Sequence, residues 1–253
     1  MRGRIAVSLM FGCVGIVIGT WTARLPAVKQ NLGLSDGLLS IALLGFAVGA
    51  IIGMQVVGRL IDRFTSRRVM LGAAVGDGVM LIVAALCPNL VVLVIAMLAF
   101  GTVHGVLNIA VNANAVEVER SVGRPVMSSF HAVYSIGGIL GAGVGALFAA
   151  VGASVVVTFV TVAVSLVGLV ATARPLALSA PVPPEAGDTA PFRLDRRLAL
   201  FGVIAFCCLV GEGAAASVVG LPAALAIPVA LAAFVAATAG ALRPRATVAH
   251  SSS

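Results

Sequence analysis

The sequence predicts an all-α, polytopic membrane protein. Hydrophobic residues make up 60% of the chain and charged residues 10%, with a mean hydropathy of +1.16. A soluble domain carries about 25% charged residues and has no interior large enough for this much apolar surface. The apolar residues also fall into runs of about 20, the length of helix that crosses a bilayer.

Eight such runs define the predicted domains. Six lie within residues 1–172 and predict a six-helix bundle; a polar, proline-rich segment, 173–197, predicts a cytoplasmic linker. Two further spans lie within 198–242, and we expect the tail at 243–253 to be disordered. The predicted spans are 5–23, 37–58, 69–87, 90–115, 127–151, 153–172, 198–217 and 221–242.

Basic residues predict the orientation of these spans. Lys and Arg are retained on the cytoplasmic side. With the N-terminus inside, only Arg24 and Lys29 of the 16 Lys and Arg residues fall in outer loops. We therefore expect both termini in the cytoplasm and a location in the bacterial cytoplasmic membrane. The pI of about 10.6 does not indicate a nucleic-acid partner, because the cations occupy short loops rather than one continuous patch.

The segment after the second span carries a recognisable motif. Residues 58–68 read GRLIDRFTSRR, with Gly58, Asp62 and Arg63 followed by Arg67 and Arg68. This pattern resembles the signature loop of the major facilitator superfamily, although Thr65 stands where the family usually has Gly. The segments WTARLP at 21–26, NIAVNAN at 108–114 and SSFHAVYSIGG at 128–138 resemble the YbjJ-like bacterial branch of that superfamily, which is distantly similar to sugar permeases.

The resemblance implies a secondary transporter that moves a small polar solute by alternating access of two six-helix halves. It runs through residues 1–217, after which the chain resembles the twelfth family helix. We therefore expect helices eight to eleven to be missing. In the family, the Asp of the signature loop contacts the eleventh helix. Asp62 would then have no such partner within the chain.

Polar side chains inside the spans are the candidate solute site, because they are costly in lipid unless paired or hydrated. In the fourth span, His104, Asn108 and Asn112 lie within about 80° of one another at 100° per residue. The fifth span offers His131 between Ser128 and Ser135. Asn108, Asn112 and His131 are our candidate solute ligands. The alternative is that these groups bond to neighbouring helices and hold the bundle together.

Two carboxylates lie inside the predicted spans. Asp77 and Glu212 are candidates for coupling transport to a proton, with Glu212 also a candidate solute ligand; the alternative for both is a neutral or paired structural group. Trp21, near the outer end of the first span, could stack on a solute or anchor the helix at the interface.

Other motifs indicate structure rather than chemistry. The repeats Gly45, Gly49, Gly53 and Gly137, Gly141, Gly145 predict close helix contacts. Glu117 and Glu119 are interpreted as partners of nearby arginines in a loop. No phosphate-binding loop, catalytic triad, metal motif or cofactor fingerprint is present in the sequence, so we expect neither an enzyme nor a cofactor.

A hypothesis of a different class stays open. Without helices eight to eleven, the chain would be a transport-inactive remnant or a membrane interaction protein that needs a partner half. The polar faces of the six-helix half would otherwise turn towards lipid, so self-association is expected in that case.

Overall fold

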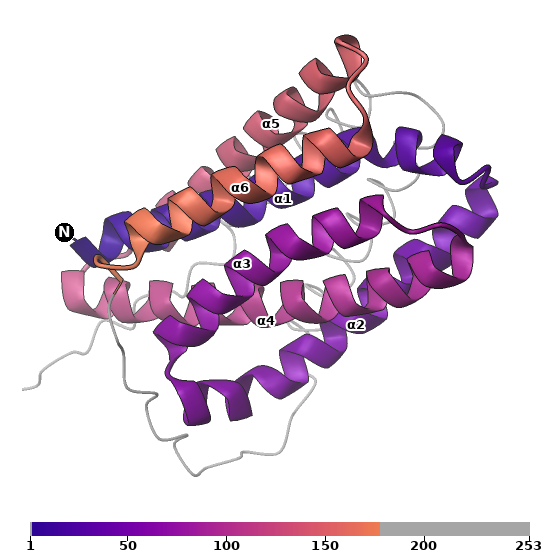
Figure 1. Ribbon diagram of the computed structural model, residues 1–253. Helices are drawn as coiled ribbons and strands as arrows, with labels where there is room; N and C mark the ends of the chain where they lie inside the picture. Colours follow the sequence, from indigo (N-terminus) through magenta and orange to yellow (C-terminus); the bar gives the residue numbers. More distant parts are fainter. Residues whose placement is uncertain (1, 178–253) are drawn as a thin grey trace, which may run out of the picture. The chain divides into compact units, whose positions relative to one another are not determined.

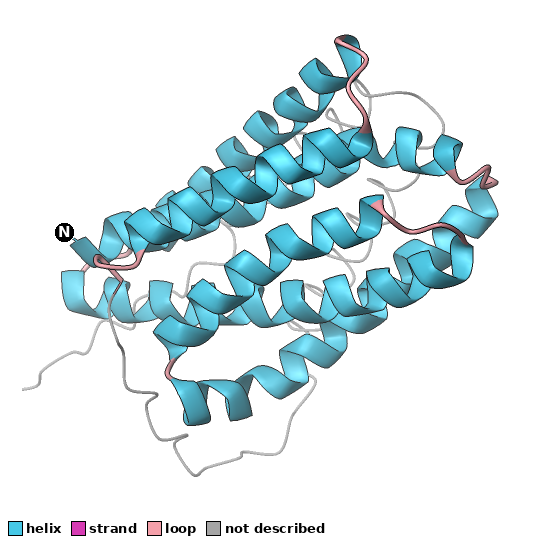
Figure 2. Cartoon of the chain, in the orientation of Figure 1, coloured by secondary structure: helices cyan, strands magenta, loops and turns pink. Residues whose placement is uncertain are grey.

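The computed structural model describes residues 2–177. These residues form six helices joined by short turns, with no strand in this part of the chain (Figures 1 and 2). All six are long and apolar enough to cross a membrane. The helices are α1 (Arg2–Asn31), α2 (Asp36–Phe64), α3 (Ser66–Ala85), α4 (Leu90–Val122), α5 (Met127–Ala150) and α6 (Val155–Ala173).

Successive helices run in opposite directions, which gathers the arginines of residues 2–177, except Arg24, at one end. At this arginine-rich end, an Arg4 guanidinium donates to Ser129 Oγ at 3.4 Å, and Arg67 donates to the backbone carbonyl of Arg174. At the opposite end, Lys29 pairs with Asp36. The structure therefore separates the basic residues as the charge pattern predicts.

The even-numbered helices all begin at the opposite end, and each has a side-chain cap. Ser35, Asn89 and Ser154 have extended backbone conformations and accept hydrogen bonds from backbone N–H groups three residues later. A cap of this kind satisfies one of the N–H groups that a helix start leaves without a partner.

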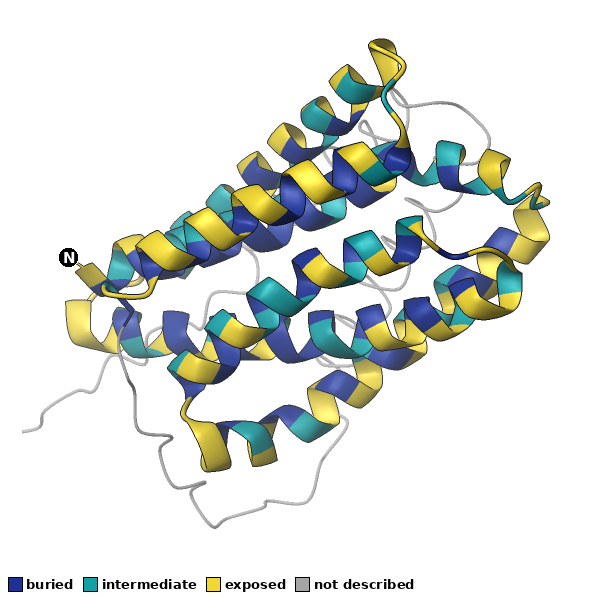
Figure 3. Cartoon of the chain, in the orientation of Figure 1, coloured by how far each residue is buried: buried dark blue, intermediate teal, exposed yellow. Residues whose placement is uncertain are grey.

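Burial divides the helices into central and peripheral ones (Figure 3). In the most apolar 18-residue window, α1 buries 56% of its residues and α4 buries 50%, whereas α2 buries 22% and α5 buries 17%. The two central helices therefore form the core, and α2 and α5 each pack mainly against one of them: α5 against α1, and α2 against α4.

Glycines permit the contact between α1 and α5. A methyl group on Gly15 or Gly19 would run into the backbone carbonyl of Tyr134 or Gly138, respectively. In the reverse direction, a methyl group on Gly141 would meet the carbonyl of Ile16. Thr20 adds a hydrogen bond across the same contact, from its hydroxyl to the Gly141 carbonyl at 3.1 Å.

The contact between α2 and α4 has the same construction. Gly49 and Gly53 face the carbonyls of Leu98 and Thr102, while Gly101 and Gly105 of α4 face carbonyls of α2. The predicted role of the Gly45 and Gly137 repeats in helix contacts is confirmed. The complementary glycines on α1 and α4 were not predicted.

The signature segment is not a loop. Gly58, Asp62 and Arg63 belong to the last turns of α2, and Arg67 and Arg68 to the first turn of α3. Only Thr65 separates the two helices, with φ +76° and ψ 143°. A β-branched residue is strongly disfavoured at positive φ, so this is the position where the glycine usual in the family fits best.

Three helices are longer than the apolar spans predicted within them. The observed α1, α2 and α4 extend beyond the predicted spans because their polar ends continue the helix outside the apolar core. Of the expected linker 173–197, residues 178–197 lie outside the described residues. The same holds for the spans 198–217 and 221–242 and the tail 243–253.

We expect Gly141→Ala to weaken the α1–α5 contact. The added methyl group meets the Ile16 carbonyl, and overpacking of this kind costs about 1–3 kcal/mol. Thermal unfolding in mild detergent should show a lower midpoint. Gly143→Ala is the matched control: Gly143 lies two residues further along the same helix, and no atom of the described residues is within 4 Å of the new methyl group. Equal midpoints for the two variants would contradict the packing role.

Thr65→Gly should raise the unfolding midpoint. Glycine removes the conformational strain at positive φ, which is on the order of 1–3 kcal/mol. Thr65→Ala keeps a Cβ atom and should give no comparable gain. A gain of the same size in both variants would show that the threonine side chain, and not the backbone conformation, is at fault.

Candidate functional site

A buried acid–imidazole pair occupies the middle of the bundle. Asp77 of α3 and His104 of α4 are both buried, and Asp77 Oδ2 lies 2.8 Å from His104 Nδ1. Helices α3 and α4 follow one another through a short turn, which brings these residues, 27 positions apart, into contact. Two ionisable groups thus share a hydrogen bond inside a membrane-spanning bundle.

The surroundings of this pair are mostly apolar. The ring centroid of Phe46 on α2 lies 5.5 Å from that of His104. Phe100 contacts the imidazole edge-on, with ring centroids 6.4 Å apart. Asp77 Oδ1 is buried and has no hydrogen-bond partner among residues 2–177. A buried carboxyl oxygen in this situation is costly if it is charged, so a proton or a further donor would stabilise it.

Asn108 and Asn112 follow His104 along α4. Both are partly exposed. The Asn112 amide donates to the backbone carbonyl of Asn108 at 2.8 Å and lies 3.4 Å from its side-chain oxygen. This leaves the Asn108 amide NH₂ and the Asn112 Oδ1 without hydrogen-bond partners in the described part of the chain. The two asparagines therefore present a donor and an acceptor next to each other.

His131 lies on α5 and is exposed. Its ring contacts Phe11 of α1 edge-on, with centroids 5.2 Å apart. The neighbouring Ser135 hydroxyl donates to the His131 backbone carbonyl, so it is satisfied within its own helix. No hydrogen bond joins His131 to Asn108 or Asn112, and α4 and α5 touch only marginally.

Trp21 does not lie on an open face. It is 6% exposed and packs between Phe100 of α4 and Phe159 of α6, with centroid distances of 6.0 Å to each. The side chain is thus part of the apolar core, which disagrees with both predicted roles, stacking on a solute and anchoring at the interface. Glu212, the other carboxylate candidate, lies outside the described residues.

The signature residues lie on the surface of the arginine-rich end. Asp62 and Arg63 are exposed; the Arg63 guanidinium lies 5.4 Å from the ring centroid of Phe64. Asp62 makes no ion pair within residues 2–177, where the only pairs are Lys29–Asp36 and His104–Asp77.

Two polar residues have structural roles that the sequence did not suggest. Glu119 does not pair with an arginine: its Oε2 accepts from the backbone N–H groups of Val126 and Met127 at 2.7 and 2.8 Å, which caps the start of α5. Arg24 is buried and donates to the Ala153 carbonyl at 2.6 Å, which ties α1 to the turn before α6.

The arrangement offers two kinds of chemistry. The Asp77–His104 pair can hold or release a proton in the interior, and the asparagine amides with His131 can bond to a polar molecule. Metal binding has no support in the described residues, where no three His, Cys, Asp or Glu residues come together.

Comparison with known proteins agrees with this architecture. Residues 6–245 match the Major Facilitator Superfamily. The uncharacterized transporter y4wD of Sinorhizobium fredii is 36% identical over 79% of this chain and 54% of its own length. An uncharacterized MFS-type transporter of Yersinia pestis is 34% identical over 55% of this chain and 36% of its own length.

A third relative, membrane protein MosC of Rhizobium meliloti, is 27% identical over 54% of this chain and 33% of its own length. The chain thus spans about half of the first of these relatives and about a third of the other two. Residues 2–177 contain six helices that are long and apolar enough to cross a membrane, and the family match covers most of the chain; this chain is an integral membrane protein that belongs to the major facilitator superfamily.

Proposed function

We propose that the protein takes part in secondary active transport of a small polar solute, sugar-like in its hydrogen-bonding groups, by alternating access and with proton coupling. In this proposal residues 2–177 are the N-terminal half of the carrier. The observation that carries it is the buried hydrogen bond between Asp77 and His104. Ionisable groups inside membrane spans are rare and mark substrate or proton pathways.

Proton coupling requires a group whose protonation changes the balance between two conformations. Asp77 joins α3 to α4 through His104, so a change in its charge would alter the contact between these helices. One carboxyl oxygen of Asp77 is buried without a hydrogen-bond partner in the described part of the chain. The balance between its charged and neutral forms therefore depends on the surroundings more strongly than that of an exposed carboxylate. Glu212 remains a second candidate for this role.

The solute would bind to Asn108, Asn112 and His131. Asparagine amides donate and accept hydrogen bonds, and imidazole does the same, which suits a polyhydroxylated molecule. In α4 and α5 these residues lie in the half of each helix nearer the arginine-rich end. A second half of the carrier would close the site from the opposite side.

A second candidate function rests on the peripheral helices. Both α2 and α5 leave large apolar side chains exposed, among them Leu44, Ile51, Ile139 and Leu147. If helices eight to eleven are absent, as the resemblance implies, a partner half or a second copy would cover part of these faces. The protein would then be transport-inactive alone, or a membrane interaction protein.

Transport assays can separate coupling from binding. In proteoliposomes tested with a panel of sugars and other small polar solutes, Asp77→Asn should abolish uptake driven by a pH gradient and retain exchange of solute across the membrane without a gradient. Asn112→Leu and His131→Leu should lose both activities. Size-exclusion profiles like that of the wild type would show that each variant folds.

Two outcomes would contradict the assignments. Gradient-driven uptake that survives Asp77→Asn would remove Asp77 from the coupling role. The absence of saturable flux for every solute, with a chain that associates with itself or a partner, would favour the interaction protein.

Orientation is the other part of the proposal, with both termini in the cytoplasm. Single cysteines in a variant without native cysteines should be labelled from the cytoplasmic side at 59–68 and from the outside at Lys29 and Asp36. Labelling at 59–68 by an impermeant reagent in intact cells would reverse the orientation.

A further inference from the structure

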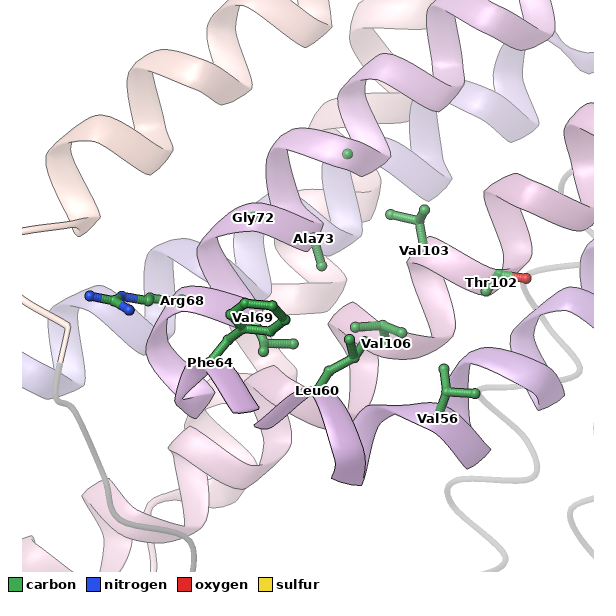
Figure 4. Close-up of a pocket in the computed structure, with 11 residues that line it drawn as sticks. Val56, Leu60, Phe64, Arg68, Val69, Gly72, Ala73, Thr102, Val103 and Val106 are labelled. Atoms are coloured by element: carbon green, nitrogen blue, oxygen red, sulfur yellow. The ribbon is translucent and has the colours of Figure 1, made fainter. Parts of the chain in front are cut away.

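An apolar groove lies between α2, α3 and α4, and none of the polar residues of the candidate site lines it. Its volume is about 530 Å³, within the range of about 300–1,000 Å³ of ligand sites. Aliphatic and aromatic side chains form its walls, including Val56, Leu60, Val103 and Val106 (Figure 4). Its one hydroxyl, that of Thr102, donates to the Leu98 carbonyl of its own helix at 2.8 Å.

One cation lies at the end of this groove. Arg68 lines the groove where α2 meets α3, and its guanidinium is directed away from the apolar side chains (Figure 4). Arg68 is exposed and has no ion pair or hydrogen bond within residues 2–177. Arg63 lies close by, against the ring of Phe64, which also lines the groove.

We propose that this groove binds an anionic phospholipid of the surrounding bilayer, with an acyl chain between α2, α3 and α4 and the headgroup phosphate on Arg68. An apolar body that ends at a single cation is complementary to an amphiphile with an anionic head. Basic residues at the ends of membrane helices attract such headgroups. A polar solute would find no hydrogen-bond partner along the groove, so the occupant is chemically distinct from the proposed transport substrate.

The groove follows α3 from Arg68 to Gly76, about 12 Å of helix. Gly72 lies in this stretch, and a methyl group added there would meet no atom of residues 2–177 within 4 Å. The position lines the groove and has room for a Cβ atom, so Gly72→Leu would place an apolar side chain in the space of the acyl chain. This provides a test of the apolar part that is independent of the charge.

The experiment measures lipid binding to the purified full chain by native mass spectrometry. Phosphatidylglycerol and phosphatidylcholine with identical acyl chains are compared as probes. The wild type should bind phosphatidylglycerol preferentially. Arg68→Gln should reduce its affinity about five-fold, as expected for about 1 kcal/mol per basic residue, and Arg68→Lys should retain most of it.

Gly72→Leu should weaken binding of both lipids. Arg120→Gln is the control for charge, because Arg120 is exposed at the same end of the bundle but outside the groove. Gly168→Leu is the control for bulk, since Gly168 also has no described atom within 4 Å of an added Cβ and lies outside the groove. Both controls should bind as the wild type does.

Equal binding of the two lipids by the wild type would overturn the proposal, and so would unchanged binding in both Arg68→Gln and Gly72→Leu. A change in oligomeric state with Gly72→Leu, without a change in lipid binding, would assign the groove to a protein contact instead. If Gly72→Leu does not fold, the two Arg68 variants test the proposal: equal phosphatidylglycerol binding by Arg68→Gln and Arg68→Lys would overturn it. None of these outcomes depends on transport.

Discussion

The close approach of α5 to α1 and of α2 to α4 is the constraint on which the bundle depends. In both contacts, glycines of one helix face backbone carbonyls of the other, so that no side chain fits between them. Membrane helices gain little from apolar burial against each other, because lipid is equally apolar, and close van der Waals contact supplies the association instead. Two such contacts fix the peripheral helices on the central pair, and α3 and α6 then pack against each other and against the central helices.

This packing decides which polar groups are buried and which remain accessible. His104 directly precedes Gly105, whose contact with the Ala50 carbonyl fixes α4 against α2. With α4 held in this way, the imidazole contacts Asp77 on α3. One and two turns further along α4, Asn108 and Asn112 are less covered. Helix α4 thus carries one member of the enclosed acid–imidazole pair and, further along, the accessible asparagines; this places the two groups on which the proposed coupling depends on one helix.

Much of the fold follows from the sequence because lipid imposes simple rules on length and charge. All six described helices and the clustering of arginines at one end were predicted from them. The helix ends were not, since α1 and α4 continue as helices through polar residues beyond the apolar runs. Thr65 was noted as unusual, but its positive φ is a property of the backbone. The burial of Trp21 could not be predicted, because an aromatic residue near a helix end has the same pattern whether it faces lipid, solute or core.

The sequence predicted which residues form the candidate site, but not which of them contact each other. Asp77 and His104 were considered separately, although a buried acid on one helix and an imidazole on the next, across a short turn, already favour a pair. The measurement that tests the central claim most directly is infrared spectroscopy of the protein in lipid as a function of pH. A protonated carboxyl band that disappears with rising pH in the wild type and is missing from Asp77→Asn is the expected result. Identical carboxyl bands in both proteins at every pH would contradict a proton site at Asp77.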